Sequence, residues 1–284
     1  MKMYKETNFI GCDASFEEAS FVIAGIPYDG TSSFRPGSRF GPDDIRKKSY
    51  SVETFSHEQE ADLTDMKICD MGNLDFPFGN RDKVLAETEA LAQKVIDSGK
   101  KGLYIGGEHL LTLPLIRRYA DKYMGLKVIH FDAHADMRDE MLGERFSHAT
   151  VARRITELLG TKSHYMFGIR SYEKNEYEFI KKNKIFCDPD FDRFFDACKK
   201  LKNSPVYFTL DLDVFNPAEL PGLGTPEAGG ITYKDYMKYL LKGLSSLNIV
   251  GMDVLEMAPQ YDPSGNSGVF AAKVIRELIL ATGK

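Results

Sequence analysis

The stretch "VIHFDAHADMRDE" (Val128–Glu140) decides how the rest of the chain is interpreted. It begins as an apolar run typical of a buried strand, and then places Asp132, His134 and Asp136 at every second position. Alternate residues of an extended segment point to the same side. These two carboxylates and one imidazole are therefore predicted to converge where a buried strand ends.

Similar short apolar runs recur along the chain and alternate with helical patterns. Several runs lack the polar and apolar alternation of a half-exposed strand, which favours strands covered on both faces. This order predicts an α/β fold with a mostly parallel sheet and helices on both faces, in one domain spanning residues 1–284. Strands are expected at residues 20–27, 66–71, 102–107, 126–132, 164–170, 184–187, 205–213 and 247–256, and helices at 81–99, 232–244 and 267–283.

The composition excludes several classes of partner. The net charge is −5 and no long basic block occurs, which argues against nucleic acid and anionic membranes. No apolar run is long enough to span a bilayer, and the first residues lack the apolar stretch of a signal peptide. The four cysteines are scattered without a CxxC pair, which favours a reducing compartment. We therefore expect a cytoplasmic protein with a small-molecule partner.

Polar residues follow four of the expected strands. Ligands of parallel sheets bind beyond the carboxyl ends of the strands, where such residues can meet. Four aspartates in one pocket would repel and raise one another's pKa, whereas two divalent cations would balance them. Oxygen and imidazole ligands without thiolates suit Mn²⁺ better than structural zinc. A polar loop and a pair of helix caps are the alternative interpretations of either aspartate motif alone. The residues are His109, Asp132, His134, Asp136, Asp211, Asp213 and Glu256.

Several of these motifs together resemble one known family. "GGEH" (106–109), "DAHAD" (132–136), "LDLDVFNP" (210–217), "GLGTPEAGGIT" (222–232) and "MDVLEMAP" (252–259) are similar, in order and spacing, to the motifs of the ureohydrolases, the arginase and agmatinase family. The likeness runs from Pro27 to near the end of the chain. It implies an arginase-like, three-layer α/β/α fold and a centre of two Mn²⁺ ions per subunit.

The resemblance also implies how the ligands are divided. One manganese ion would be held by His109, Asp132, Asp136 and Asp211. The other would be held by Asp132, His134, Asp211 and Asp213. Asp132 and Asp211 would then bridge the two ions.

Three residues are expected to act on the substrate by the same resemblance. A hydroxide bridging the metals would attack the central carbon of a guanidinium and release urea and an amine. Asp213 would stabilise the tetrahedral intermediate, and Glu256 would hold the guanidinium through paired hydrogen bonds. His148 would shuttle protons at the mouth of the site.

The loop after the metal histidine favours agmatine as the substrate. "ADMRDEMLGERFSHAT" is similar to the loop of bacterial agmatinases, and Asp139, Glu140 and Glu144 suit a ligand that is cationic at both ends. We therefore expect hydrolysis of agmatine to putrescine and urea, a step of polyamine biosynthesis. The alternatives are arginase, guanidinobutyrase, aminopropylagmatine ureohydrolase, formimidoylglutamase and a non-catalytic ligand-binding homologue.

Further predictions concern Glu108, three other histidines, one loop and the assembly. Glu108 stands where the family usually has Asp, which affects the hydrogen bonds behind the metal ligands. His130 is expected to point away from the metals into packing, with His57 and His164 also structural. The loop "SSFRPGSRFGP" (Ser32–Pro42), with Arg35 and Arg39, suggests a structural or subunit-contact role rather than anion binding. The family resemblance implies a homo-oligomer, a trimer or a hexamer.

Overall fold

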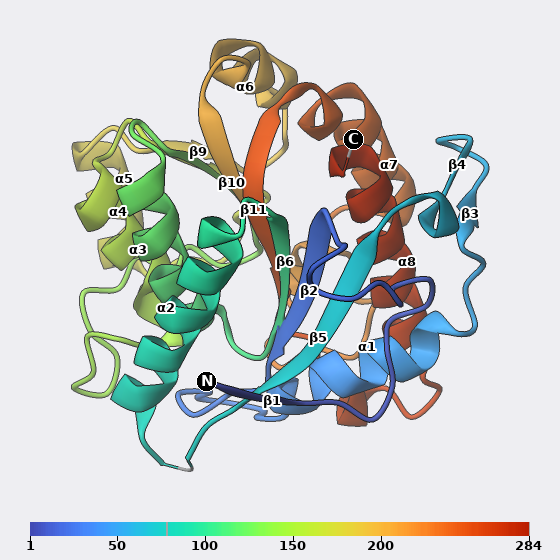
Figure 1. Ribbon diagram of the computed structural model, residues 1–284. Coiled ribbons are helices and arrows are strands. Elements are labelled where there is room, and N and C mark those ends of the chain that lie inside the picture. The colour runs from blue at the N-terminus through green and yellow to red at the C-terminus, as the bar shows by residue number, and fades with distance from the viewer. Residues whose placement is uncertain (78, 284) are drawn as a thin grey trace.

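A nine-stranded sheet forms the centre of the computed structural model, which describes residues 1–77 and 79–283 (Figure 1). The strand order is β1-β5-β2-β6-β11-β10-β7-β8-β9, and every neighbouring pair is parallel except β1 with β5. The strands are β1 (Lys2–Tyr4), β2 (Phe21–Ile26), β5 (Ile68–Asp75), β6 (Lys101–Gly106), β7 (Lys127–Phe131), β8 (His164–Phe167), β9 (Phe186–Asp188), β10 (Pro205–Asp211) and β11 (Asn248–Leu255).

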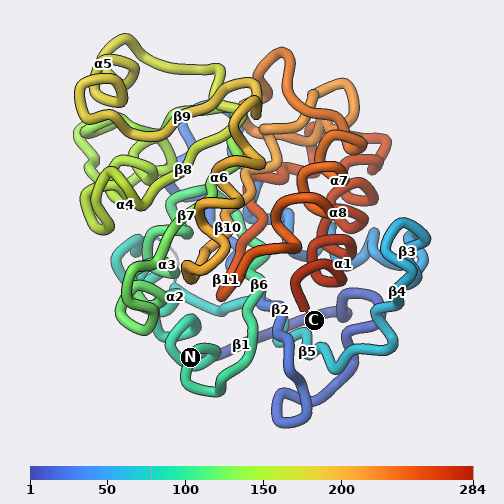
Figure 2. The backbone as a smooth tube through the Cα atoms, turned by 90° about the horizontal axis from the view of Figure 1, so that it is seen from above, coloured from blue at the N-terminus to red at the C-terminus, as the bar shows by residue number. Residues whose placement is uncertain are grey.

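Helices cover both faces of this sheet. Figures 1 and 2 show α2, α3 and α4 on one side, and α1, α7 and α8 on the other. The fold is therefore the predicted three-layer α/β/α arrangement. The helices are α1 (Gly41–Ser49), α2 (Arg81–Asp97), α3 (Thr112–Lys122), α4 (Val151–Leu159), α5 (Lys174–Lys182), α6 (Phe194–Leu201), α7 (Tyr233–Lys242) and α8 (Asn266–Thr282).

The strand β2 shows why the central strands lack alternation in sequence. All six of its residues are buried. Phe21 and Ile23 pack into the apolar cluster under α1, α7 and α8, whereas Val22, Ala24 and Ile26 pack into the cluster under α2 and α3. Successive side chains point to opposite faces, and both faces are covered, so every position must be apolar.

The expected strands all occur, with shifted ends. The main shift is in β5, which continues to Asp75 through polar residues because β1 and β2 pair with it from both sides. Several elements were not expected individually, namely β1, α1, α3, α4, α5, α6 and the small hairpin of β3 (Phe55–Ser56) and β4 (Ala61–Asp62). Helix α1 starts in the Gly-rich and Pro-rich loop, where Pro42 takes an early helical position that tolerates proline.

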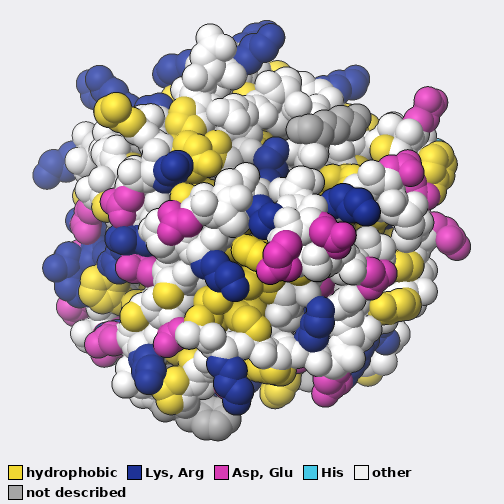
Figure 3. Space-filling model, in the orientation of Figure 1, with side chains coloured by type: hydrophobic (Ala, Val, Ile, Leu, Met, Phe, Trp, Pro, Cys, Tyr) yellow, Lys and Arg dark blue, Asp and Glu magenta, His cyan; other side chains and the backbone are white. Residues whose placement is uncertain are grey.

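The surface carries mixed charge. Lys and Arg side chains are interspersed with Asp and Glu over the face drawn in Figure 3. Within the described ranges, no helix combines the length and the apolar character needed to cross a bilayer.

Candidate metal centre and active site

The central strands bring the polar residues of four distant motifs to one edge of the sheet. The neighbouring strands β6, β11, β10 and β7 end beside one another because all four run parallel. His109 follows β6, Glu256 follows β11, Asp211 ends β10, and Asp132 follows β7. These residues are far apart in the sequence but lie close together in the fold, as expected for a site beyond the carboxyl ends of parallel strands.

His109 is surrounded by carboxylates on the side of its Nδ1 atom. This atom lies 3.1 Å from Asp132 Oδ2, 3.1 Å from Asp211 Oδ2 and 3.5 Å from Asp136 Oδ2. The residue is fully buried, yet none of the described residues forms a well-aligned hydrogen bond with its Nδ1. A buried polar nitrogen without a partner is costly, and a cation among these oxygens would satisfy it.

The other ring nitrogen of His109 is already occupied. Its Nε2 lies 3.0 Å from the Thr209 hydroxyl, which lies 3.2 Å from the Thr112 hydroxyl. Thr112 in turn donates to Asp253 Oδ2. Such contacts behind a ligating histidine fix its ring orientation and its tautomer. They leave Nδ1 as the nitrogen that faces the carboxylates.

A second group forms around His134. Its Nδ1 lies 2.7 Å from Asp213 Oδ2 and 3.8 Å from Asp132 Oδ1. The two oxygens of Asp132 thus face different histidines, Oδ2 toward His109 and Oδ1 toward His134. Asp211 lies on the His109 side through Oδ2, and its Oδ1 accepts from the Asp213 amide. The six predicted ligands lie together, with Asp132 between the two histidines.

The electrostatics of the cluster show an excess of buried negative charge. Burial and repulsion from Asp132 raise the pKa of Asp136 well above its usual range. Burial and repulsion from Asp213 do the same to the pKa of Asp211. Burial opposes protonation of His134, but Asp213 outweighs it and raises the pKa of this imidazole to about 11. Each of these raised pKa values means that the site favours additional positive charge, from bound protons or from a cation.

The donor set therefore fits two divalent cations. It consists of four carboxylates and two imidazoles without a thiolate, which suits a hard or borderline metal such as Mn²⁺.

Backbone strain also marks this edge of the sheet. Asp136 has φ 49° and Glu256 has φ 68°, in the left-handed region that non-glycine residues rarely adopt. Such conformations cost on the order of 1 kcal/mol and cluster at functional sites. At Glu256 the conformation is fixed by two contacts: its amide donates to the Gly107 carbonyl, and its Oε1 accepts from the His109 amide.

The expected orientation of His130 is wrong. Its Nε2 lies 2.9 Å from Asp132 Oδ2, and its Nδ1 lies 3.0 Å from His164 Nε2, whose ring continues to Thr156. His130 and Asp132 are two residues apart and so share one face of the strand, a register that the sequence already contained. Because both nitrogens are engaged, His130 supports Asp132 from behind rather than competing as a ligand. His164 belongs to the same series of hydrogen-bonded side chains, which runs from Asp132 through His130 to Thr156.

The three predicted catalytic residues border one cavity of about 290 Å³. Glu256 lies beside the cluster, and burial together with Glu108 raises its pKa. His148 begins a short 3-10 helix (His148–Thr150) after a capping box at Ser147. Burial and the charges of His134 and His109 lower the pKa of His148 to about 4. The cavity lining includes His134, Asp136, Asp211, Asp213, His148 and Glu256.

The structure contradicts the expected role of the acidic loop in binding the substrate. Among the described residues, Asp139, Glu140 and Glu144 do not line this cavity. Asp139 pairs with Arg154, and Glu144 pairs with Arg81. The charged residues that line the cavity besides the predicted ligands and Glu256 are Arg138, Glu173 and Glu176. Charge in the sequence could not show which side of the loop turns inward.

Two loop residues near the site could not be predicted from the local sequence pattern. Thr31 and Ser33 contact the ring of His148, 117 and 115 residues further along the chain. Arg170 holds the opposite loop by donating to the carbonyls of Asp213 and Glu227. Thr209, by contrast, could have been predicted from the sequence, because it is two residues before Asp211 and so shares its face.

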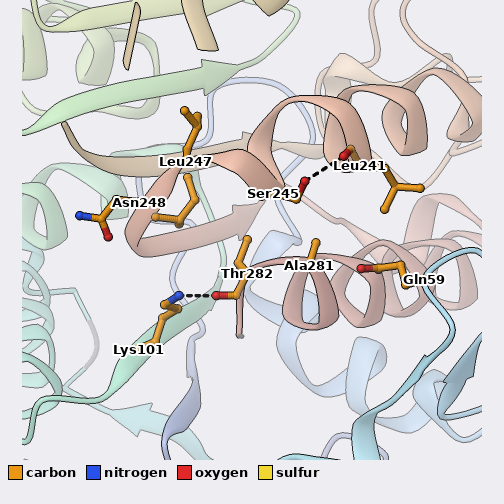
Figure 4. Close-up of a pocket in the computed structure, with 9 residues that line it drawn as sticks. Gln59, Lys101, Leu241, Ser245, Leu247, Asn248, Ala281 and Thr282 are labelled. Atoms are coloured by element: carbon orange, nitrogen blue, oxygen red, sulfur yellow. Dashed lines mark hydrogen bonds between the residues drawn. The ribbon is translucent and has the colours of Figure 1, made fainter. Parts of the chain in front are cut away.

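A larger cavity of about 460 Å³ lies at the other end of the strands (Figure 4). It is bordered by Lys101 at the start of β6, Asn248 at the start of β11 and Thr282 at the end of α8. Lys101 donates to the Thr282 carbonyl, and burial lowers its pKa. Among the described residues, its lining holds no cluster of acids and histidines like that of the smaller cavity. The smaller cavity is therefore the candidate active site.

Comparison with known proteins gives the same class of enzyme. The model of the arginase family matches residues 19–281. An agmatinase of Bacillus anthracis is 41% identical over 98% of this chain and 97% of its own length. The structure of the agmatine ureohydrolase of Thermoplasma volcanium superposes with a TM-score of 0.89 at 29% identity, covering 99% of this chain and 95% of that one. The proclavaminate amidino hydrolase of Streptomyces clavuligerus gives a TM-score of 0.85 at 26% identity, covering 99% and 97%.

The chain therefore belongs to the arginase family, and it is a hydrolase of C–N bonds in guanidino compounds.

Proposed function

We propose that this protein is an agmatinase that uses two Mn²⁺ ions to hydrolyse agmatine to putrescine and urea. The observation that carries the proposal is the buried group of four aspartates and two histidines, with Glu256 and His148 in the same cavity. The near full-length similarity to curated agmatinases supports the choice of substrate.

The charge of the cavity supports agmatine over arginine. Among the described residues that line it, Arg138 is the one Lys or Arg, and Glu173 Oε1 lies 2.8 Å from its Nη1. An α-carboxylate on the substrate would therefore meet no unpaired cation. The same argument disfavours guanidinobutyrate and formimidoylglutamate, which also carry carboxylates, whereas it leaves aminopropylagmatine as the alternative.

The ligand assignment follows the family resemblance, and the carboxylates grouped around His109 and around His134 support it. His109, Asp132, Asp136 and Asp211 would hold one ion, and Asp132, His134, Asp211 and Asp213 the other. When bound, the two ions would neutralise these carboxylates and supply a water molecule of lowered pKa as the nucleophile.

The chain's own residues would then bind the substrate and move protons. Glu256 would accept hydrogen bonds from the guanidinium, for which a charged, paired interaction is strong and directional. Asp213 would stabilise the tetrahedral carbon and pass a proton to the departing amine. His148 borders the same cavity, where its imidazole would accept a proton and release it to solvent.

A substrate panel tests this proposal. Purified protein loaded with Mn²⁺ would be assayed with agmatine, aminopropylagmatine, L-arginine, guanidinobutyrate and formimidoylglutamate, with detection of urea, ammonia and formamide. We expect the highest kcat/KM for agmatine, and loss of all turnover in Asp213→Asn prepared in the same way. A higher kcat/KM for L-arginine would contradict the substrate, and no product from any compound would favour the ligand-binding homologue.

We also infer from the family resemblance that the chain acts in the cytoplasm as a homo-oligomer, a trimer or a hexamer. Light scattering coupled to size exclusion would test the assembly, and a monomer at micromolar concentration would contradict it.

A further inference from the structure

One loop holds the imidazole of His148 at both ring nitrogens. The Thr31 hydroxyl lies 3.2 Å from Nδ1, and the Ser33 hydroxyl lies 3.3 Å from Nε2. The backbone amide of His148 also donates to Thr31 Oγ1 over 3.0 Å. Thr31 therefore contacts both the ring and the backbone of the same histidine.

Thr31 is in turn held by a fully buried acid. Glu108 Oε1 lies 2.6 Å from the Thr31 hydroxyl, and Glu108 Oε2 lies 2.7 Å from the Thr31 amide. The side chain of Glu108 is 0% exposed, so these contacts are shielded from water. The carboxyl group of the residue that replaces the family's usual Asp thus contacts the loop through Thr31.

The hydrogen-bond capacity of a hydroxyl decides the direction of each bond. A threonine hydroxyl has one proton to donate and two lone pairs to accept. In its ionised form Glu108 only accepts, so the single hydroxyl proton of Thr31 is then donated to it. The two lone pairs then accept from the His148 amide and from His148 Nδ1, which must carry a proton.

We propose that Glu108, acting through Thr31, fixes His148 in the tautomer with its proton on Nδ1, so that Nε2 is the nitrogen that exchanges protons in the cavity. Glu108 and Thr31 are positioning residues in this scheme, because they act through His148. The inference rests on the proposed role of His148 in proton transfer.

The loop is anchored well enough to hold Thr31 in place. Asp29 Oδ2 accepts from the Gly37 amide over 2.6 Å. At the loop's other end, Arg35 donates to the Leu223 carbonyl over 2.6 Å and lies 4.3 Å from the centre of the Tyr261 ring. The Gly-rich and Pro-rich motif, together with the preceding Thr31, thereby gains a function, which is to present two hydroxyls to His148.

Replacing Glu108 by Gln should reverse the tautomer. The Thr31 amide can only donate, so the carbonyl oxygen of Gln must face it, and the NH₂ group must face the Thr31 hydroxyl. That hydroxyl would then accept from Gln and donate its own proton to His148 Nδ1. Neutron diffraction of the Mn²⁺-loaded protein should show the deuteron of His148 on Nδ1 in the wild type and on Nε2 in Glu108→Gln.

Kinetics would separate positioning from general damage to the site. We expect Glu108→Gln and Thr31→Val to lower kcat about 10- to 100-fold with KM changed less than about 3-fold, since general acid–base catalysis contributes about 10²- to 10⁴-fold. Thr31→Ser, which keeps the hydroxyl, should restore kcat to within about 3-fold. The exposed Glu178→Gln on α5 serves as the matched control.

A double-mutant cycle supplies the decisive comparison. In a His148→Asn background, Glu108→Gln should lower kcat by less than about 2-fold, because residues that act as one unit are not additive. A loss of kcat in that background as large as in the wild type, or an unchanged tautomer, would overturn the inference. The proposed function fails separately if the wild type releases no urea, or if His148→Asn alone keeps full activity.

Discussion

Replacing Asp136 by Asn should raise the stability of the metal-free protein and reduce the further stabilisation by Mn²⁺. Burial and repulsion from Asp132 raise the folded-state pKa of Asp136 above its unfolded value. The folded protein then holds the proton more tightly, so ionisation at neutral pH subtracts from stability. Asn removes that charge and also tolerates the left-handed φ of 49° at this position. The metal-free variant should therefore have the higher free energy of unfolding.

The effect of Mn²⁺ can be given a size. At a free concentration of about 100 Kd each site adds about 2.7 kcal/mol, because binding only to the folded state shifts the equilibrium. With an unfolding entropy of about 0.6 kcal/mol per degree for 284 residues, two sites should raise Tm by about 9 °C. If losing the Asp136 carboxylate weakens one site about 100-fold, that site adds only about 0.4 kcal/mol. The Mn²⁺-dependent rise of the variant should then be about 5 °C.

Differential scanning calorimetry at one protein concentration, with chelator and with Mn²⁺, measures both quantities. Asp65→Asn, at an exposed position away from the cluster, is the matched control and should behave as the wild type. The reasoning is refuted if Asp136→Asn destabilises the metal-free protein, or if its Tm rises with Mn²⁺ as much as that of the wild type.

Two further predictions concern residues behind the site and away from it. His130→Ala should weaken Mn²⁺ binding about 10- to 100-fold, since it removes the hydrogen bond that supports Asp132; titration calorimetry of metal-free protein measures this, and unchanged affinity would contradict the role. Asp262 has a pKa lowered to about 2, because hydrogen bonds from Ser264 and Ser267 outweigh the opposing effect of burial. Its contribution of about 2 kcal/mol is present above the unfolded pKa near 4 and lost as pH falls toward 2. The stability difference between wild type and Asp262→Asn should therefore shrink between pH 4 and pH 2, and a constant difference in chemical unfolding would exclude this account.

The local pattern of the sequence determined the strands of the sheet and several residues of the candidate site. Runs such as "SFVIAGIP" (Ser20–Pro27) are apolar at every position because the strand is packed on both faces, so the parallel sheet and its strands could be predicted. The spacing of Asp132, His134 and Asp136 placed three side chains of the cluster at a strand end, and the motif series indicated the family. The same alternation rule, applied to His130, would have given its contact with Asp132.

Only the tertiary structure decided which residues surround the cluster. Thr31 reaches His148 across 117 residues, and the periodicity of a strand or helix cannot encode a contact between two loops. Asp139 and Glu144, in the loop after Asp136, had the right charge but pair with Arg154 and Arg81. Most strands and the polar residues at their ends could be predicted from the sequence, because they depend on short-range backbone geometry. The direction of loop side chains depends on what packs against them, and that is set by the whole fold.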